Sequence, residues 1–171
     1  MKKHLVVGGI TLVLIIVSLC GCTNTPSGLR YTNSKYGFGL NPPEGWTTQE
    51  APTPNGTMIL FIGPETLGNF TTNMGIMIDT SFSGHTLQNL SHKIIEPFLG
   101  NMNFSLLQNT EITVNGMNAY EIVYTMDLLK QKIVIVEKNT LVLVIIYLTL
   151  TSTYNTYLSD FDASVNSLVI E

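Results

Sequence analysis

Charged residues are scarce in this sequence, and the basic ones form no cluster. Asp, Glu, Lys and Arg make up 12% of the 171 residues, which is about half of the usual share, and Arg30 is the single arginine. Nucleic-acid binding depends on clustered Lys and Arg side chains that neutralise phosphates. We therefore expect no nucleic-acid partner.

Cysteine is almost absent as well. The two cysteines, Cys20 and Cys22, are separated by a single residue, so they lack the spacing of a thioredoxin-like redox pair. Two thiolates without a second Cys or His pair nearby cannot complete a tetrahedral zinc site. The sequence also lacks the Gly-x-Ser-x-Gly and Ser-x-x-Lys motifs of serine enzymes. We therefore predict no catalytic residue, no metal and no cofactor.

The chain begins instead with the pattern of an export signal. A short basic segment precedes an apolar run over residues 5–20, which is the order of a secretory signal and is short for a membrane span of about 20 residues. Leu19-Cys20-Gly21-Cys22 resembles the lipobox of lipoproteins, in which the last Cys becomes the lipid-bearing N-terminus. We predict that residues 1–21 are removed and that Cys22 anchors the protein to the external face of the cell membrane. An uncleaved anchor is the alternative.

Cleavage at this point would leave an acidic chain without a free thiol. Six Lys and Arg residues would remain against twelve Asp and Glu residues, for a formal net charge of −6. Residues 22–34 are polar and contain Pro and Gly, which is typical of a flexible linker. We interpret them as a lipidated tether, followed by one folded domain over residues 35–171.

Hydrophobic periodicity predicts a mostly β domain with two helices. Alternating or continuous apolar runs indicate strands at 36–40, 58–62, 74–79, 104–114, 119–128, 132–137 and 141–150. Residues 48–56 and 63–73 are expected to be loops, and Asn115-Gly116 is a strong tight-turn pair. Helical spacing covers 86–96, capped by Thr86, and about 153–169, capped by Ser152. On the second helix, Asp160 and Asp162 are expected on the solvated face.

Two of the expected strands, 132–137 and 141–150, are apolar on both faces. Strands of this kind need cover on both sides of the sheet. The predicted fold class is therefore α+β, with an antiparallel sheet of about six or seven strands between helices in an α/β/α sandwich.

Three segments carry a family resemblance that covers roughly residues 31–170. They are an aromatic strand followed by a Pro-x-Gly-Trp turn (Tyr36, Phe38, Pro43, Gly45 and Trp46), a hairpin with Asn115-Gly116 at its turn and Tyr120 and Tyr124 beyond it, and the closing amphipathic helix. This pattern resembles the PsbP-like superfamily. The resemblance implies a non-enzymatic scaffold that docks on larger assemblies. Because the first residues of the chain differ from a plastid transit peptide, we infer a lipoprotein of a prokaryote, with an archaeon among the candidate sources.

Few side chains are candidates for a metal site or a modification site. His85, His92 and Glu96 lie along one predicted helix face, where His92 and Glu96 are spaced to share a metal or to be an ordinary solvated pair. Asn55 and Asn69 begin Asn-x-Ser/Thr sequons in expected loops and are candidate glycosylation sites.

These observations lead to one main functional hypothesis and two alternatives. The main hypothesis is a lipid-anchored, non-catalytic binding or accessory module for an envelope protein or complex. The alternatives are a metal-dependent hydrolase that uses His85, His92 and Glu96, and a structural component of the cell surface.

Overall fold

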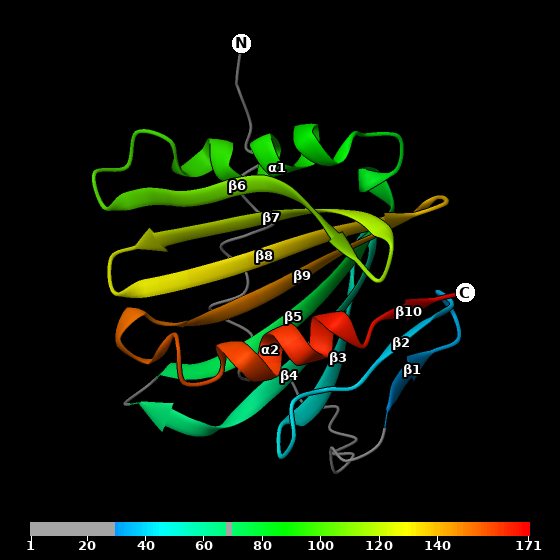
Figure 1. Cartoon of the computed structure of the whole chain (residues 1–171), viewed down its shortest axis with the longest axis horizontal. Helices are drawn as coiled ribbons and strands as arrows, with labels where there is room; N and C mark the ends of the chain where they lie inside the picture. The colour runs from blue at the N-terminus through cyan, green and yellow to red at the C-terminus, as the bar shows by residue number, and fades with distance from the viewer. Residues whose placement is uncertain (1–29, 68–69) are drawn as a thin grey trace.

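A seven-stranded antiparallel sheet forms the centre of the fold in the computed structural model, which describes residues 30–67 and 70–171 (Figure 1). Its strand order is β3-β4-β5-β9-β8-β7-β6. The strands are β3 (Thr47–Thr53), β4 (Gly56–Leu67), β5 (Phe70–Asp79), β6 (Phe104–Val114), β7 (Met117–Met126), β8 (Leu129–Lys138) and β9 (Leu141–Leu150). The predicted sheet of six or seven antiparallel strands is confirmed.

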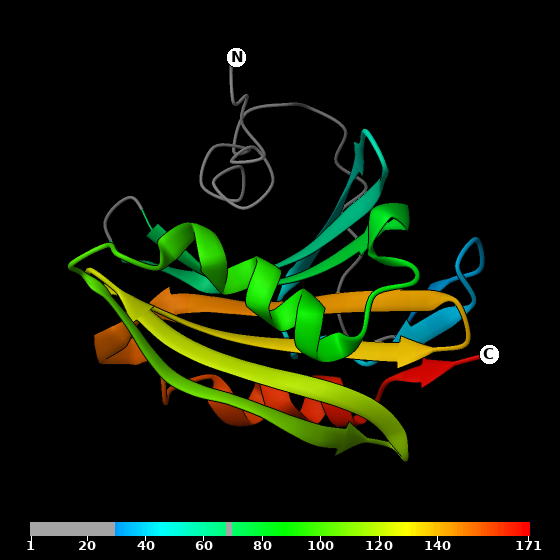
Figure 2. The same ribbon diagram turned by 90° about the horizontal axis from the view of Figure 1, so that it is seen from above.

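The two helices cover opposite faces of this sheet (Figure 2). Helix α1 (Leu87–Ile95) packs Leu90, Ile94 and Ile95 on one face, and helix α2 (Leu158–Asn166) packs Phe161 and Val165 on the other. Each fully buried side chain of this size contributes about 1.5–3 kcal/mol by leaving water. The predicted helix–sheet–helix sandwich is therefore confirmed, and it contains one core on each side of the sheet.

The central strands supply both cores. In β9, Val142, Val144 and Ile146 face α1, whereas Leu143 and Ile145 face the α2 side, and all are buried. This placement explains why β8 and β9 show no polar alternation. None of the helices in the described part of the chain is long and apolar enough to cross a membrane.

Helix α1 begins and ends as its sequence predicts. The Thr86 side chain accepts a hydrogen bond from the backbone N–H of Asn89 at 3.2 Å, which satisfies one of the free donors of the first turn. The helix ends at Ile95, and a 3-10 turn with Pro97 follows (η3, Glu96–Phe98).

The second helix is shorter than predicted. Residues 151–153 form a separate 3-10 turn (η4, Thr151–Thr153), so Ser152 does not cap α2, which starts only at Leu158. Tyr154 lies in the turn between the two elements and is buried against Tyr147. At the other end, Val169 and Ile170 leave the helix and form strand β10 (Val169–Ile170).

Two segments expected as loops are strands. Residues 48–56 contain most of β3 and its turn into β4, and residues 63–73 belong largely to β4 and β5. The prediction was wrong because β3 is an edge strand that pairs with β4 through its backbone and needs few apolar side chains. Its Pro52 is tolerated because an edge strand can lack one ladder donor.

The folded domain also starts earlier than residue 35. Strand β1 (Tyr31–Asn33) pairs with β2 (Phe38–Leu40), and β2 pairs with β10, in a small second sheet. The Tyr31 ring packs edge-on against Phe61 with 5.6 Å between ring centroids. Residues 31–33, predicted as tether, are therefore part of the fold, because an aromatic side chain in them joins the core.

The tight turn at Asn115-Gly116 is confirmed. Both residues adopt a left-handed backbone, with φ of 50° and 75°, as the two central positions of a type I′ hairpin turn require. The turn sets the register of β6 against β7, in which Val114 lies opposite Met117.

Candidate functional site

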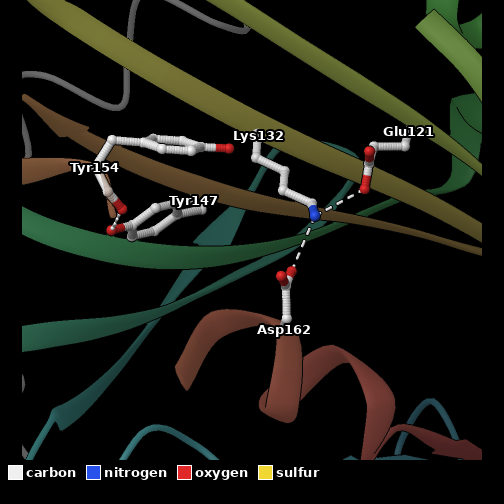
Figure 3. Close-up of polar contacts among 5 residues, drawn as sticks. All are labelled: Glu121, Lys132, Tyr147, Tyr154 and Asp162. Atoms are coloured by element: carbon white, nitrogen blue, oxygen red, sulfur yellow. Dashed lines mark hydrogen bonds and ion pairs between the residues drawn. The ribbon is translucent and has the colours of Figure 1, made fainter. Parts of the chain in front are cut away.

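A cluster of charged and aromatic side chains lies between the sheet and helix α2 (Figure 3). Its charged members are Glu121 on β7, Lys132 on β8 and Asp162 on α2. The pairing of β7 with β8 places Val123 opposite Lys132 and Glu121 opposite Val134. Glu121 and Lys132 are thus diagonal neighbours on one face of the sheet, at a spacing that long side chains can bridge.

Lys132 joins the two carboxylates. Its Nζ lies 2.8 Å from Glu121 Oε2 and 2.9 Å from Asp162 Oδ1. The side chains of Lys132 and Glu121 are only 14% and 13% exposed, while Asp162 is 40% exposed. The cluster therefore links two strands to the helix, and one of its two ion pairs is largely withdrawn from water.

The pKa of Lys132 follows from this environment. Burial lowers the pKa, but the hydrogen bonds to Glu121 and Asp162, together with their negative charges, raise it by more, so it lies above the ordinary value of 10.5. A lysine that acts as a base or nucleophile near neutral pH needs a lowered pKa. Lys132 is instead held as a permanent cation.

Two buried tyrosines continue the cluster along α2. Tyr147 donates a hydrogen bond to the backbone carbonyl of Tyr154 at 2.9 Å, and its ring stacks on Phe161 at a centroid distance of 5.2 Å. Burial raises the pKa of Tyr147 to about 12. Burial, with the negative charges of Asp162 and Glu121, raises the pKa of Tyr154 to about 12 as well. Both phenols are therefore neutral at physiological pH.

A second lysine lies over one of these rings. Lys130 Nζ is 3.9 Å from the centroid of Tyr154, a cation–π contact worth roughly 0.5–1 kcal/mol where it is partly exposed. Beyond it, the hydroxyls of Thr72, Thr149 and Thr153 are joined by hydrogen bonds of 2.9 and 3.0 Å. The polar groups named here thus have partners within the protein, and the arrangement is suited to holding α2 and the η4 segment on the sheet.

Comparison with known proteins agrees with this architecture. The sequence family described as PsbP-like protein matches residues 23–170.

The chain belongs to the PsbP-like family.

Two solved structures share the fold of this PsbP-like domain. The solution structure of cyanobacterial PsbP (CyanoP) from Synechocystis sp. PCC 6803 is similar with a TM-score of 0.62 and 15% sequence identity, and the match covers 91% of this chain and 99% of that one. The crystal structure of PA94 from Pseudomonas aeruginosa, a protein of unknown function, has a TM-score of 0.60 and 16% identity over 84% of this chain and 96% of that one. No curated protein is significantly similar in sequence. At these identities the structural matches establish the fold alone.

The histidines of the PsbP-like domain are not gathered into a metal site. His85 lies before α1, and its Nε2 is 3.0 Å from Lys93 Nζ, while His92 and Glu96 are exposed. Among the described residues, no group of three or more His, Cys, Asp or Glu side chains is placed to hold a metal ion.

The remaining predicted sites are only partly within the described chain. Asn55 is exposed at the turn between β3 and β4, while the hydroxyl of Thr57, the third residue of its sequon, hydrogen-bonds that of Tyr36 at 3.3 Å. Glycosylation of Asn55 stays a prediction. Asn69 and the predicted lipidation site Cys22 lie outside the described residues, as do the signal segment 1–21 and most of the predicted tether.

The ion cluster itself was not foreseen. Asp162, expected on the solvated face of the second helix, faces the sheet instead and binds Lys132. A signal for this is present in the sequence, because Asp162 lies four residues after Leu158 and directly after Phe161, both of which pack on the core. The contact between Glu121 and Lys132 can be predicted only if the register of β7 against β8 is known. The hydrophobic periodicity of the sequence does not give this register.

Proposed function

We propose that this PsbP-like protein is a lipid-anchored, externally facing, non-catalytic accessory module that binds a protein or complex of the cell envelope. The observation that carries the proposal is the combination of a sequence that resembles a lipobox, ending at Cys22, with a PsbP-like domain whose first strand starts at Tyr31. A short connection between the two would keep the domain close to the membrane surface.

The chemistry of the polar cluster gives no support to a catalytic role, which is compatible with the non-catalytic module proposed. Lys132 is held as a cation by two carboxylates, and Tyr147 and Tyr154 keep their protons to about pH 12. Catalytic acids and bases are usually tuned towards the working pH. The pKa values of Lys132, Tyr147 and Tyr154 are instead all raised, which moves them further from neutral pH.

The lipid anchor is tested by expressing the full chain in a prokaryotic host and comparing Cys22→Ala with Cys20→Ala. We expect the wild type and Cys20→Ala to fractionate with membranes and to carry the added mass of a lipid on a chain that begins at residue 22. Cys22→Ala should lose this mass. If Cys22→Ala stays in the membrane with the same mass difference, the lipid anchor is refuted and the uncleaved anchor is favoured.

The accessory role is tested by affinity capture of the anchored protein from its native membranes. A binding module predicts one partner in a fixed ratio to the bait. A structural component of the surface predicts high abundance without such a partner. Metal analysis of the purified protein tests the hydrolase alternative, because metal bound in a 1:1 ratio and lost in His92→Ala would overturn the non-catalytic proposal.

A further inference from the structure

The chain contains four Asn-x-Ser/Thr sequons, and three of them lie within the described residues, at Asn55, Asn89 and Asn103. A sequon of this kind is suited to an N-linked glycan where it lies on a surface segment, because the sugar is bulky and strongly hydrated. The asparagine and the hydroxyl residue must both be accessible to the enzyme that recognises the sequon. The three sequons differ in this respect.

Two of these sequons are poorly accessible in the folded protein. Asn89 lies in helix α1, and the hydroxyl residue of its sequon, Ser91, is fully buried and hydrogen-bonded to the helix backbone. Asn55 is exposed, but Thr57 is partly buried and its hydroxyl is hydrogen-bonded to that of Tyr36. In both sequons the protein itself occupies the hydroxyl group that an enzyme has to recognise.

The sequon of Asn103 lies at the surface. Asn103 belongs to the turn that precedes β6, in which the backbone N–H of Phe104 donates to the carbonyl of Asn101 at 3.1 Å. Asn103 and Ser105 are both exposed, while Phe104 between them packs against the core on the α1 side of the sheet. Phe104 therefore holds this segment on the domain, and the two residues that define the sequon stay in water.

The side-chain amide of Asn103 is also accessible. Its Nδ2 donates to Oδ1 of Asp127 at 2.5 Å, and Asp127 is an exposed residue at the turn from β7 to β8. A hydrogen bond between two exposed groups contributes little net stability, because each group can bond to water instead. The amide nitrogen can therefore leave this contact and react without disturbing the core.

Exposed apolar side chains gather beside Asn103. The backbone N–H of Asp127 donates to the carbonyl of Asn103 at 3.3 Å, so the loop before β6 and the turn after β7 meet at one end of the sheet (Figure 1). The exposed apolar side chains of these two segments and of the start of β6 are Leu99, Met102, Leu106, Leu107 and Leu128. An uncovered apolar patch favours aggregation. A glycan at Asn103 would place a hydrated group next to this patch.

We propose that Asn103 carries an N-linked glycan, which a membrane transferase of the cell adds outside the cytoplasm from a lipid-linked sugar phosphate. Nδ2 of Asn103 forms a bond to the anomeric carbon of the sugar, and the bond between that carbon and the phosphate oxygen of the donor breaks. The lipid phosphate leaves with the bonding electron pair, and the amide nitrogen loses one proton. The step is a group transfer and needs no oxidant or reductant.

The proposal rests on the external location proposed above, because the sugar is added on that side of the membrane. It depends neither on the lipid at Cys22 nor on an envelope partner. It also adds a site to the predicted glycosylation sites Asn55 and Asn69.

Peptide mass spectrometry of the full chain from its native membranes tests the proposal. We expect the peptide that contains Asn103 to carry a sugar mass localised on that residue, and the peptide that contains Asn89 to have its unmodified mass. Asn103→Gln should lose the sugar on this peptide completely. Asn89→Gln is the matched control, because it removes a sequon whose hydroxyl residue is buried, and it should leave the sugar at Asn103 in place.

Two substitutions of Ser105 test whether the sequon itself is recognised. Ser105→Ala should lose the sugar although Asn103 is retained, whereas Ser105→Thr should keep it, because Thr completes the sequon as Ser does. Both changes are at an exposed side chain, so both variants should fold.

An unmodified mass for the Asn103 peptide of the wild type would overturn the proposal. So would a sugar that stays on this peptide in Asn103→Gln or in Ser105→Ala. The N-terminal peptide reports the lipid on Cys22 in the same spectra. A lipidated chain with an unmodified Asn103 overturns this proposal alone, and a chain with sugar on Asn103 but no lipid refutes the anchor alone.

Discussion

Lys132 on the sheet and Asp162 on helix α2 are joined by an ion pair of 2.9 Å, and the same ammonium group lies 2.8 Å from Glu121 on the neighbouring strand. Three elements far apart in the sequence are thus linked through one cation. Because this cation lies where α2 meets the sheet, we expect its removal mainly to lower the stability of the fold.

Replacing Lys132 with Met should lower the free energy of unfolding by about 2–3 kcal/mol, because it leaves the nearly buried carboxylate of Glu121 without a partner. Lys93→Met, on the exposed face of α1, is the control and should change stability by less than about 0.5 kcal/mol. Urea unfolding followed by circular dichroism measures both. The double variant Lys132→Met with Glu121→Gln should recover part of the loss. An unchanged urea midpoint for Lys132→Met would contradict a stabilising role for the cluster.

Stability should fall as pH rises from about 10 to 12. An unfolded tyrosine loses its proton near the ordinary pKa of 10.0, whereas Tyr147 and Tyr154 in the folded protein keep theirs to about 12. In this window the unfolded state binds fewer protons than the folded state, so ionisation favours unfolding. Lys132 acts in the same direction, since its raised pKa stabilises the fold only until the pH passes above 10.5.

The expected loss is roughly 1 kcal/mol for each tyrosine by pH 11. Urea midpoints at about pH 8 and about pH 11 measure it. Tyr147→Phe should be less stable than the wild type near neutral pH, because it loses the hydrogen bond to Tyr154, but its midpoint should depend less on pH. Equal midpoints for the wild type at the two pH values would contradict the prediction.

The sequence predicts those elements whose signals are local. Helix α1 follows from its apolar stripe and from Thr86, the β6–β7 hairpin from Asn115-Gly116, and β9 from its continuous apolar run. Strand β3 could not be foreseen in this way, because its residues are polar and its structure comes from backbone pairing with β4. The ion cluster of Glu121, Lys132 and Asp162 depends on strand register and on the docking of α2, and both are properties of the whole fold.

The two predicted helix caps should respond differently to substitution. Thr86→Ala should cost about 1 kcal/mol, because it removes the acceptor for the backbone N–H of Asn89 at the first turn of α1. Ser152→Ala should cost less than about 0.5 kcal/mol, because Ser152 is exposed and lies in η4 rather than at the start of α2. Thermal unfolding of the two variants measures the difference. Equal losses would mean that the Thr86 hydrogen bond contributes nothing specific.

The start of the folded domain is tested by two truncated chains, one beginning at residue 30 and one at residue 35. The longer chain keeps β1, in which the Tyr31 hydroxyl donates to Glu50 Oε1 at 2.7 Å and the ring packs against Phe38 and Phe61. Tyr31 is only partly buried against the core, so loss of its side chain should cost about 1–2 kcal/mol, and the shorter chain should unfold at a lower urea concentration. Tyr31→Ala in the longer chain should reproduce most of this loss, whereas Thr32→Ala, whose side chain is exposed, should not. If the two truncated chains are equally stable, residues 31–34 act as a tether and contribute nothing to the fold.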